Sequence, residues 1–288
     1  MRVELATQRA NILGEGPLWH AGRARLYWVD IRSRRIEWLE PQSGAAGRHE
    51  TPVRASALAV RAAGGLLLAG DRCIGVLDLE TGAFEQRLSF EAGKPNNRSN
   101  DGAMGADGRF WFGTMDDAAA PRQGALYALS SDWRLQCLRE GLSIPNGIAI
   151  AANGRTLYLA DSLDQTISTH AIGADGALGP PARFFSAHGK AATPDGAALD
   201  AEGFLWSAQW DGACLLRLAP DGAVAAKVDM PVSRPTACAF GGPDLNTLYI
   251  TSAREGLSPA ELARQPLAGS VFKLAAPAPG LPRPAFAG

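Results

Sequence analysis

An apolar pair recurs six times along the chain, at intervals of 41 to 48 residues. A glycine-bearing turn precedes each pair, and such turns between apolar runs are typical of β-hairpins. The pairs are Leu26-Tyr27, Leu67-Leu68, Phe110-Trp111, Leu157-Tyr158, Leu205-Trp206 and Leu248-Tyr249. Short runs separated by turns about every 8–12 residues favour β-strands over a helical repeat of similar period. The period therefore predicts the blades of a β-propeller.

Each repeat has room for four strands. Five of them end in a fourth, more polar run, at 49–53, 86–90, 134–138, 182–185 and 226–230. The sixth has none, because residues 275–288 are rich in Pro and Gly, whereas the N-terminal run 2–7 has no partner of its own. Pairing these two completes six four-stranded sheets and leaves no open seam in the ring. We predict an all-β protein, one six-bladed β-propeller domain over residues 1–288, closed by the N-terminal strand. Because the repeat crosses every plausible boundary, a two-domain division is excluded.

Charge and cysteine content narrow the function classes. Lys and Arg total 28 against 29 Asp and Glu, so no basic surface for nucleic acid or an anionic membrane is expected. No uncharged run reaches the roughly 18 residues of a membrane span, and the N-terminus lacks the apolar core of a signal peptide. The four cysteines lie far apart, which predicts reduced thiols. We expect a cytoplasmic protein, a monomer or weak homo-oligomer.

The first strand of each propeller blade lines the central channel. Aligned at the small residue that opens each of these strands, the preceding residue is polar in all six repeats. These six axial residues are Glu15, Ser56, Asp101, Asn146, Asp195 and Thr236. Three carboxylates at one end of a channel repel one another and require protons or a cation. Oxygen donors without a convergent His or Cys pair suit a hard divalent ion. Calcium, zinc, magnesium, manganese and ferrous iron all remain open as the metal.

The strand directions place particular loops beside these residues. Inner strands begin at the axial site, so loops from second to third strands and from blade to blade lie on the same face. Two second-to-third loops are long, 115–124 and 253–269, and Ser258-Pro-Ala-Glu261 in the latter predicts a short capped helix. The blade-to-blade loop 94–100 brings Arg98 and Asn100 next to the channel. Together these loops predict a pocket around the acidic floor.

Several motifs together resemble those of the regucalcin (senescence marker protein)/gluconolactonase family of sugar lactonases. They are Leu13-Gly-Glu15-Gly-Pro-Leu-Trp19, Arg98-Ser-Asn-Asp-Gly102, Gly113-Thr-Met115, Pro145-Asn146-Gly147, Pro194-Asp195-Gly196 and Phe240-Gly-Gly-Pro-Asp-Leu, followed by the run 249–254 and by 265–269. The resemblance covers residues 13–272 in order. It implies one divalent metal ion held by Glu15, Asn146 and Asp195, and substrate contacts from Arg98 and Asn100, with Asp101 beside them. Some relatives add an acidic contact after the Gly-Thr-Met motif. The matching position here is Ala118, which leaves the role of the 115–124 loop and the choice of sugar open.

These observations predict divalent-metal-dependent hydrolysis of a sugar lactone to its aldonic acid, with Asp195 as the base that accepts a proton from water. Glucono-, galactono-, xylono- and arabinonolactone are all candidate substrates. A metal-dependent esterase or phosphotriesterase on the same propeller and a non-catalytic calcium-binding protein are the alternatives. A serine hydrolase is disfavoured, because the chain has no G-x-S-x-G motif and the repeat places none of its four histidines near the channel.

Overall fold

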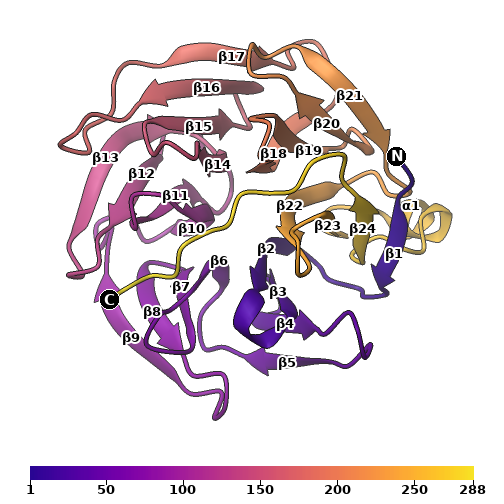
Figure 1. Cartoon of the computed structure of the whole chain (residues 1–288), viewed down its shortest axis with the longest axis horizontal. Helices are drawn as coiled ribbons and strands as arrows, with labels where there is room; N and C mark the ends of the chain where they lie inside the picture. Colours follow the sequence, from indigo (N-terminus) through magenta and orange to yellow (C-terminus); the bar gives the residue numbers. More distant parts are fainter.

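The computed structural model describes all 288 residues and consists of six four-stranded antiparallel sheets around a central channel (Figure 1). Five blades are formed by consecutive strands. These are β2 (Gly14–His20), β3 (Arg25–Asp30), β4 (Arg35–Leu39) and β5 (Ala46–Glu50); β6 (Ala55–Val60), β7 (Leu66–Gly70), β8 (Cys73–Leu77) and β9 (Phe84–Ser89); β10 (Asn97–Met104), β11 (Phe110–Asp116), β12 (Gly124–Leu129) and β13 (Leu135–Leu142); β14 (Pro145–Ile150), β15 (Thr156–Asp161), β16 (Thr166–Ala171) and β17 (Ala182–Ser186); and β18 (Thr193–Leu199), β19 (Leu205–Trp210), β20 (Cys214–Leu218) and β21 (Val224–Asp229). The predicted six-bladed propeller is confirmed.

The sixth blade joins the two ends of the chain. It consists of β22 (Pro235–Gly241), β23 (Thr247–Ser252), β24 (Val271–Ala275) and, outermost, β1 (Glu4–Thr7). Glu4 lies opposite Lys273 and Leu5 opposite Phe272 in the antiparallel pair, so charge and apolar contacts both favour this register. In Figure 1 the indigo β1 accordingly lies at the edge of the yellow blade. The predicted closure by the N-terminal strand is confirmed.

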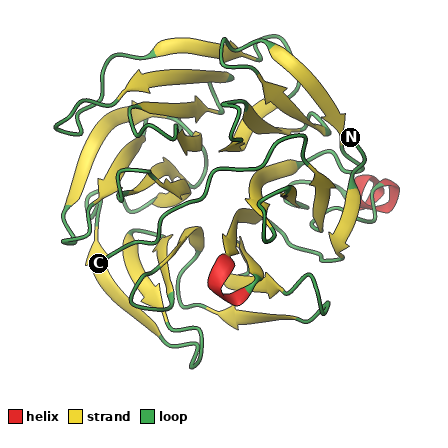
Figure 2. Ribbon diagram, in the orientation of Figure 1, coloured by secondary structure: helices red, strands yellow, loops and turns green.

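Two short helical segments interrupt the strands (Figure 2). One is the 3₁₀ turn η1 (Ala21–Arg23), and the other is α1 (Pro259–Arg264), whose Ser258 and Glu261 form the predicted capping box. Boundaries of outer strands differ from expectation. The fourth strand of the first blade ends at Glu50 rather than continuing to Val53, because the Thr51 hydroxyl donates to the carbonyls of Arg34 and Val53 and turns the chain toward the next blade.

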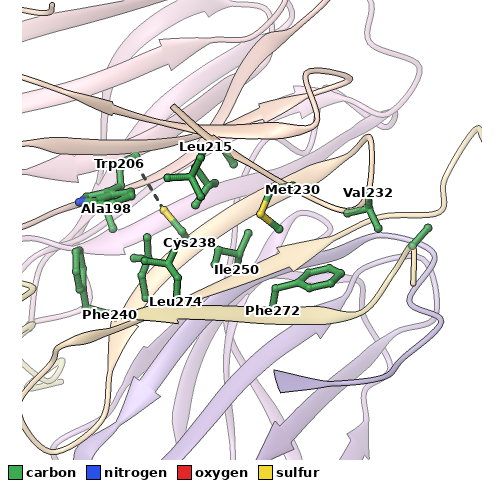
Figure 3. Packing of buried hydrophobic residues seen from close by; sticks show 14 residues of the cluster. Ala198, Trp206, Leu215, Met230, Val232, Cys238, Phe240, Ile250, Phe272 and Leu274 are labelled. Atoms are coloured by element: carbon green, nitrogen blue, oxygen red, sulfur yellow. Dashed lines mark hydrogen bonds between the residues drawn. The ribbon is translucent and has the colours of Figure 1, made fainter. Parts of the chain in front are cut away.

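Apolar side chains fill the spaces between neighbouring blades. Figure 3 shows one such cluster, in which Trp206 and Leu215 of the fifth blade pack against Cys238, Ile250 and Phe272 of the sixth. These side chains are almost completely buried. All four cysteines are free and three of them are buried, as predicted. No helix in the structure is long and apolar enough to cross a membrane.

Residues 276–288, which we call the C-terminal strap, cross the propeller face at which the inner strands end (Figure 1). Near the start of the strap Gly280 N–H donates to Leu245 O, and near its end Phe286 N–H donates to Val60 O. It thereby ties the sixth blade to the second, and a largely apolar cavity of about 620 Å³ lies beneath it. The sequence predicted only that this Pro- and Gly-rich segment forms no strand.

Candidate active site

A β-bulge occurs at the same place in all six inner strands. The register shifts fall between Glu15 and Leu18, Ala55 and Ala57, Ser99 and Gly102, Asn146 and Ala149, Pro194 and Ala197, and Pro235 and Cys238. Every predicted axial residue lies within or at the edge of its bulge, and a bulge re-aims side chains relative to the sheet. The bulges themselves were not predicted. The glycines that follow four axial residues were the signal, since Gly16 and Gly147 adopt positive φ values of 52° and 55°.

The three axial carboxylates form no direct ion pair, although the nearby Arg98 acts to lower the pKa of Glu15 and Asp195, and Arg283 acts to lower that of Asp101. No ion pair in the structure involves Glu15, Asp101 or Asp195. The oxygens of Asp101 instead accept the backbone N–H groups of Gly102 and Ile148, both at 2.8 Å, which links the third blade to the fourth. Glu15 accepts the N–H of Gly16 at 3.1 Å. The floor of the site is therefore acidic and rigidly held.

Burial and mutual repulsion favour the protonated forms of these groups. Burial and the nearby Asp101 raise the pKa of Glu15 to about 8. Burial raises the pKa of Asp101 to about 6. Burial, Glu15 and Asp101 together raise the pKa of Asp195 well above its usual range. A bound cation would replace these protons and relieve the repulsion.

The predicted ligand Asn146 is connected to the predicted substrate contacts by hydrogen bonds. Its Nδ2 donates to Ser162 Oγ at 2.9 Å, and its Oδ1 accepts from Asn100 Nδ2 at 3.0 Å. The Oδ1 of Asn100 in turn accepts from Arg98 Nη1 at 2.9 Å. The structure thus brings Arg98, Asn100 and Asn146 together in one continuous chain of contacts. Asn146 and Asp195 are both buried.

The other two axial residues serve the scaffold. Ser56 Oγ lies 2.6 Å from Ser99 Oγ, and Thr236 Oγ1 donates to the carbonyl of Gly14 at 2.5 Å. Both side chains are satisfied and almost fully buried.

The donor set suits a hard divalent ion by its chemistry rather than by a preformed cluster. No group of three or more His, Cys, Asp or Glu side chains in the structure is arranged to hold a metal ion. The ligand set implied by the resemblance contains two carboxylates, Glu15 and Asp195, and one amide oxygen, from Asn146. All three are oxygen donors, and neither carboxylate is engaged in an ion pair. The residues therefore fit a metal such as calcium or magnesium.

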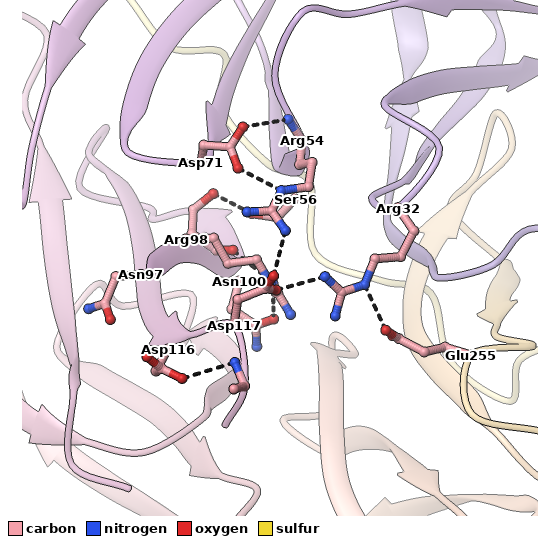
Figure 4. Close-up of polar contacts among 12 residues, drawn as sticks. Arg32, Arg54, Ser56, Asp71, Asn97, Arg98, Asn100, Asp116, Asp117 and Glu255 are labelled. Atoms are coloured by element: carbon pink, nitrogen blue, oxygen red, sulfur yellow. Dashed lines mark hydrogen bonds and ion pairs between the residues drawn. The ribbon is translucent and has the colours of Figure 1, made fainter. Parts of the chain in front are cut away.

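Above this floor, three arginines surround one carboxylate (Figure 4). Arg32 Nη1 and Arg98 Nε donate to Asp117 Oδ1 at 2.7 and 2.9 Å, and Arg54 Nη1 donates to Asp117 Oδ2 at 2.7 Å. Glu255 binds the Nε of Arg32 at 2.6 Å. Partial burial acts to raise the pKa of Asp117, but the hydrogen bonds from Arg54 and Arg32 hold it well below its usual range.

This network confirms that the predicted loops share one face, which we call the site face. Arg32 follows β3, Asp117 follows β11 and Glu255 follows β23, so three second-to-third loops meet there, and Arg54 comes from a blade-to-blade loop. Sequence reasoning identified Arg98 but missed Arg32, Arg54 and Asp117 as members of the site. The available signal was the Asp116-Asp117 pair directly before Ala118, where the resemblance called for an acidic contact.

Comparisons with known proteins agree with this architecture. The sequence model of the SMP-30/gluconolactonase/LRE-like region matches residues 13–254. The chain is 35% identical to a 6-deoxy-6-sulfogluconolactonase of Pseudomonas putida, with 99% of each chain covered. It is 34% identical to a pentonolactonase of Haloferax volcanii, over 98% of this chain and 97% of the relative. The crystal structure of a calcium-binding protein, regucalcin, from Agrobacterium tumefaciens superposes with a TM-score of 0.94 at 31% identity, over 98% of this chain and 96% of that one.

Proposed function

The chain belongs to the SMP-30/gluconolactonase/LRE-like family, and we propose that it is an enzyme that hydrolyses a sugar lactone to the aldonic acid. The observation that carries the proposal is the juxtaposition of an acidic floor without ion pairs and the polar side chains of Arg98 and Asn100. Relatives that cover the whole chain are named for hydrolysis of sugar lactones. A group of polar side chains of this kind suits a small substrate rich in hydroxyl groups.

We propose that the reaction depends on one divalent metal ion held by Glu15, Asn146 and Asp195. The absence of any ion pair at Glu15 and Asp195, together with their raised pKa values, supports a cation at this position. When bound, such an ion supplies Lewis-acid polarisation of the lactone carbonyl. The solved relative described as a calcium-binding protein favours a divalent ion without fixing which one.

The protein's own groups account for the proton transfers. A water oxygen adds to the lactone carbonyl carbon, and the Asp195 carboxylate accepts the proton that the water loses. The C–O bond to the ring oxygen then breaks, and the proton passes to that oxygen, which leaves as a hydroxyl of the open aldonic acid.

Arg98 and Asn100 orient the substrate in this scheme. Asn100 Nδ2 also donates to the carbonyl of Pro145 at 3.1 Å, so its amide is fixed at both ends. Held in this way, Arg98 offers its unused Nη2 donor and Asn100 the remaining acceptor capacity of its Oδ1 to the sugar hydroxyls at the edge of the floor. Asp101 lies beside them and contributes negative charge to the floor. We propose that Asp101 also contacts the substrate directly.

The test is hydrolysis of glucono-, galactono-, xylono- and arabinonolactone by metal-stripped protein, with each divalent ion added back separately. We expect one or more ions to restore acid release, and Glu15→Gln and Asp195→Asn to abolish it. Asp229→Asn, on the exposed outer strand β21, is the matched control and should keep full activity. Tight metal binding without turnover of any lactone would instead favour the non-catalytic calcium-binding alternative.

We further propose that the protein acts in the cytoplasm as a monomer or weak homo-oligomer. Four free cysteines, three of them buried, support a reducing compartment.

A further inference from the structure

The arginine cluster, consisting of Arg32, Arg54 and Arg98, leaves hydrogen-bonding capacity unused. Each guanidinium donates from its Nε and Nη1 atoms, and no hydrogen bond in the structure involves any of the three Nη2 atoms. The only fully buried side-chain nitrogen or oxygen atoms without a partner belong to His20 and Arg25. The three Nη2 groups are therefore accessible to solvent, although the side chain of Arg98 is only 4% exposed.

The charges of the cluster are arranged unevenly. All three guanidiniums converge on the single carboxylate of Asp117, whereas Glu255 and Asp71 bind the Nε sides of Arg32 and Arg54. Three cations thus share one anion at the centre, and Asp117 remains 31% exposed there. Guanidinium groups bind carboxylate, phosphate and sulfonate oxygens with strong, directional hydrogen bonds. The arrangement is that of an anion site in which one of the chain's own carboxylates takes part.

The cluster is connected directly to the reaction site. Arg98 belongs to it through Asp117, and Arg98 also bonds to Asn100, which contacts Asn146 on the floor. In the proposed complex, a lactone whose carbonyl lies over Glu15 and Asp195 has its far end against the loops that carry Arg32 and Arg54, because Arg98 contacts both regions. The three arginines come from the first three blades, so the cluster depends on how neighbouring blades pack.

Building on the proposed lactone hydrolysis, we propose that Arg32, Arg54 and Arg98 form an anion subsite that selects lactones with a negatively charged group remote from the carbonyl. The three free Nη2 groups donate to oxygens of that group, whether carboxylate, phosphate or sulfonate. Arg32 and Arg54 are then specificity-determining residues.

The first test compares kcat/KM for matched lactones with the metal-loaded enzyme. The uncharged member is glucono-1,5-lactone, and the charged members are its 6-phospho and 6-deoxy-6-sulfo derivatives and glucaro-1,4-lactone. We expect at least one charged lactone to exceed the neutral one by about tenfold or more, since a charge-assisted hydrogen bond has about that effect. In Arg54→Gln and Arg32→Gln the ratio of charged to neutral kcat/KM should fall about 10- to 100-fold. In Arg54→Lys, which keeps the charge, the ratio should fall less.

Arg48→Gln is the control, because it removes an equally charged side chain from the outer strand β5 of the first blade. It should leave the ratio unchanged, and the melting temperature of each variant identifies any that fail to fold. Hydrolysis of neutral lactones with an unchanged ratio in Arg54→Gln would overturn the anion subsite while the lactonase function stands.

A second measurement is independent of turnover. Calorimetric titration of the full-length protein with inorganic phosphate, at constant ionic strength, should show binding that weakens about tenfold or more in Arg54→Gln and not in Arg48→Gln. If no lactone of either kind is hydrolysed, the proposed function fails, and this titration still decides the subsite. Absence of binding, or equal binding by both variants, would overturn it.

Discussion

The raised pKa values at the floor predict that the metal-free protein loses stability as the pH rises. Glu15 has a pKa of about 8 compared with 4.5 for an ordinary glutamate. Between these values the folded state holds a proton that the unfolded state has released, so the free energy of unfolding falls as pH increases and levels off above pH 8. Over the whole interval the loss is about 5 kcal/mol, at about 1.4 kcal/mol per pKa unit. This figure is an upper limit, because the repulsion is shared with Asp101.

The cleanest interval for the measurement is pH 6.5 to 8. Burial lowers the pKa of His20, His49 and His170 from 6.5. The unfolded state therefore binds more protons at these histidines, so they make the free energy of unfolding rise with pH, opposite to the effect of Glu15. Above pH 6.5 less than half of these histidines is protonated in the unfolded state, so their opposing contribution fades as the pH approaches 8. Over this interval Glu15 contributes a loss of about 2 kcal/mol, or a fall in melting temperature of about 5 °C for a protein of this size, and the raised pKa of Asp195 acts in the same direction.

The assay is thermal unfolding followed by circular dichroism in the presence of a chelator, repeated with a saturating divalent ion. We expect the melting temperature of the metal-free protein to fall across the interval, and the ion to raise it and remove the slope. Metal-free Glu15→Gln should show a smaller slope, since it carries no titratable group at this position. A melting temperature that stays constant or rises in the metal-free wild type, or a slope unchanged in Glu15→Gln, would refute the reasoning.

Three further substitutions test other parts of the structure. Asp195→Asn should lower kcat for lactone hydrolysis at least about a hundredfold with the melting temperature retained; a loss below tenfold would remove Asp195 as the base. Gly196→Ala should destabilise the protein by about 1–3 kcal/mol, because the new Cβ would lie 2.4 Å from that of Ala237. Gly93→Ala, where a Cβ meets nothing within 4 Å, is its control, and equal melting temperatures would contradict the close packing of inner strands. Phe286→Ala should cost about 3–5 kcal/mol in urea unfolding, because this fully buried ring holds the C-terminal strap against the second and third blades; a cost below 1 kcal/mol would show that the strap contributes little.

The residues of the axial floor could be predicted from the sequence because all of them occupy the same position in the repeat. Each inner strand has a polar residue before a small one, so aligning the repeats was sufficient to predict that Glu15, Asp101, Asn146 and Asp195 lie at one end of the channel. The alignment could not reveal that Asp101 links two blades by accepting hydrogen bonds from backbone N–H groups. Nor could it reveal that the hydroxyls of Ser56 and Thr236 form hydrogen bonds with neighbouring oxygens of the protein. Those outcomes depend on contacts between blades, which a single repeat does not encode.

The arginine cluster lies beyond such an alignment for a related reason. Arg32, Arg54 and Asp117 occupy loops that differ in length from blade to blade, and they meet only because the ring brings three blades together. The C-terminal strap was missed for the same reason, since its bonds to Val60 and Leu245 join segments far apart in sequence. The sequence period thus predicts the site residues that recur in every blade. Site residues on loops of individual blades are found only from the three-dimensional structure.

This division between strands and loops has a consequence for specificity. The floor is fixed by bulged strands and by the backbone bonds of Asp101, so a change there disturbs two blades at once. The groups that face the far end of the substrate lie on loops, where substitutions leave the sheets intact. Position 118 shows the principle, because the acidic contact implied by the resemblance is replaced by Ala118 while the neighbouring Asp117 engages three arginines. Under the proposed anion subsite, a few loop residues therefore decide which lactone is preferred, while the floor stays unchanged.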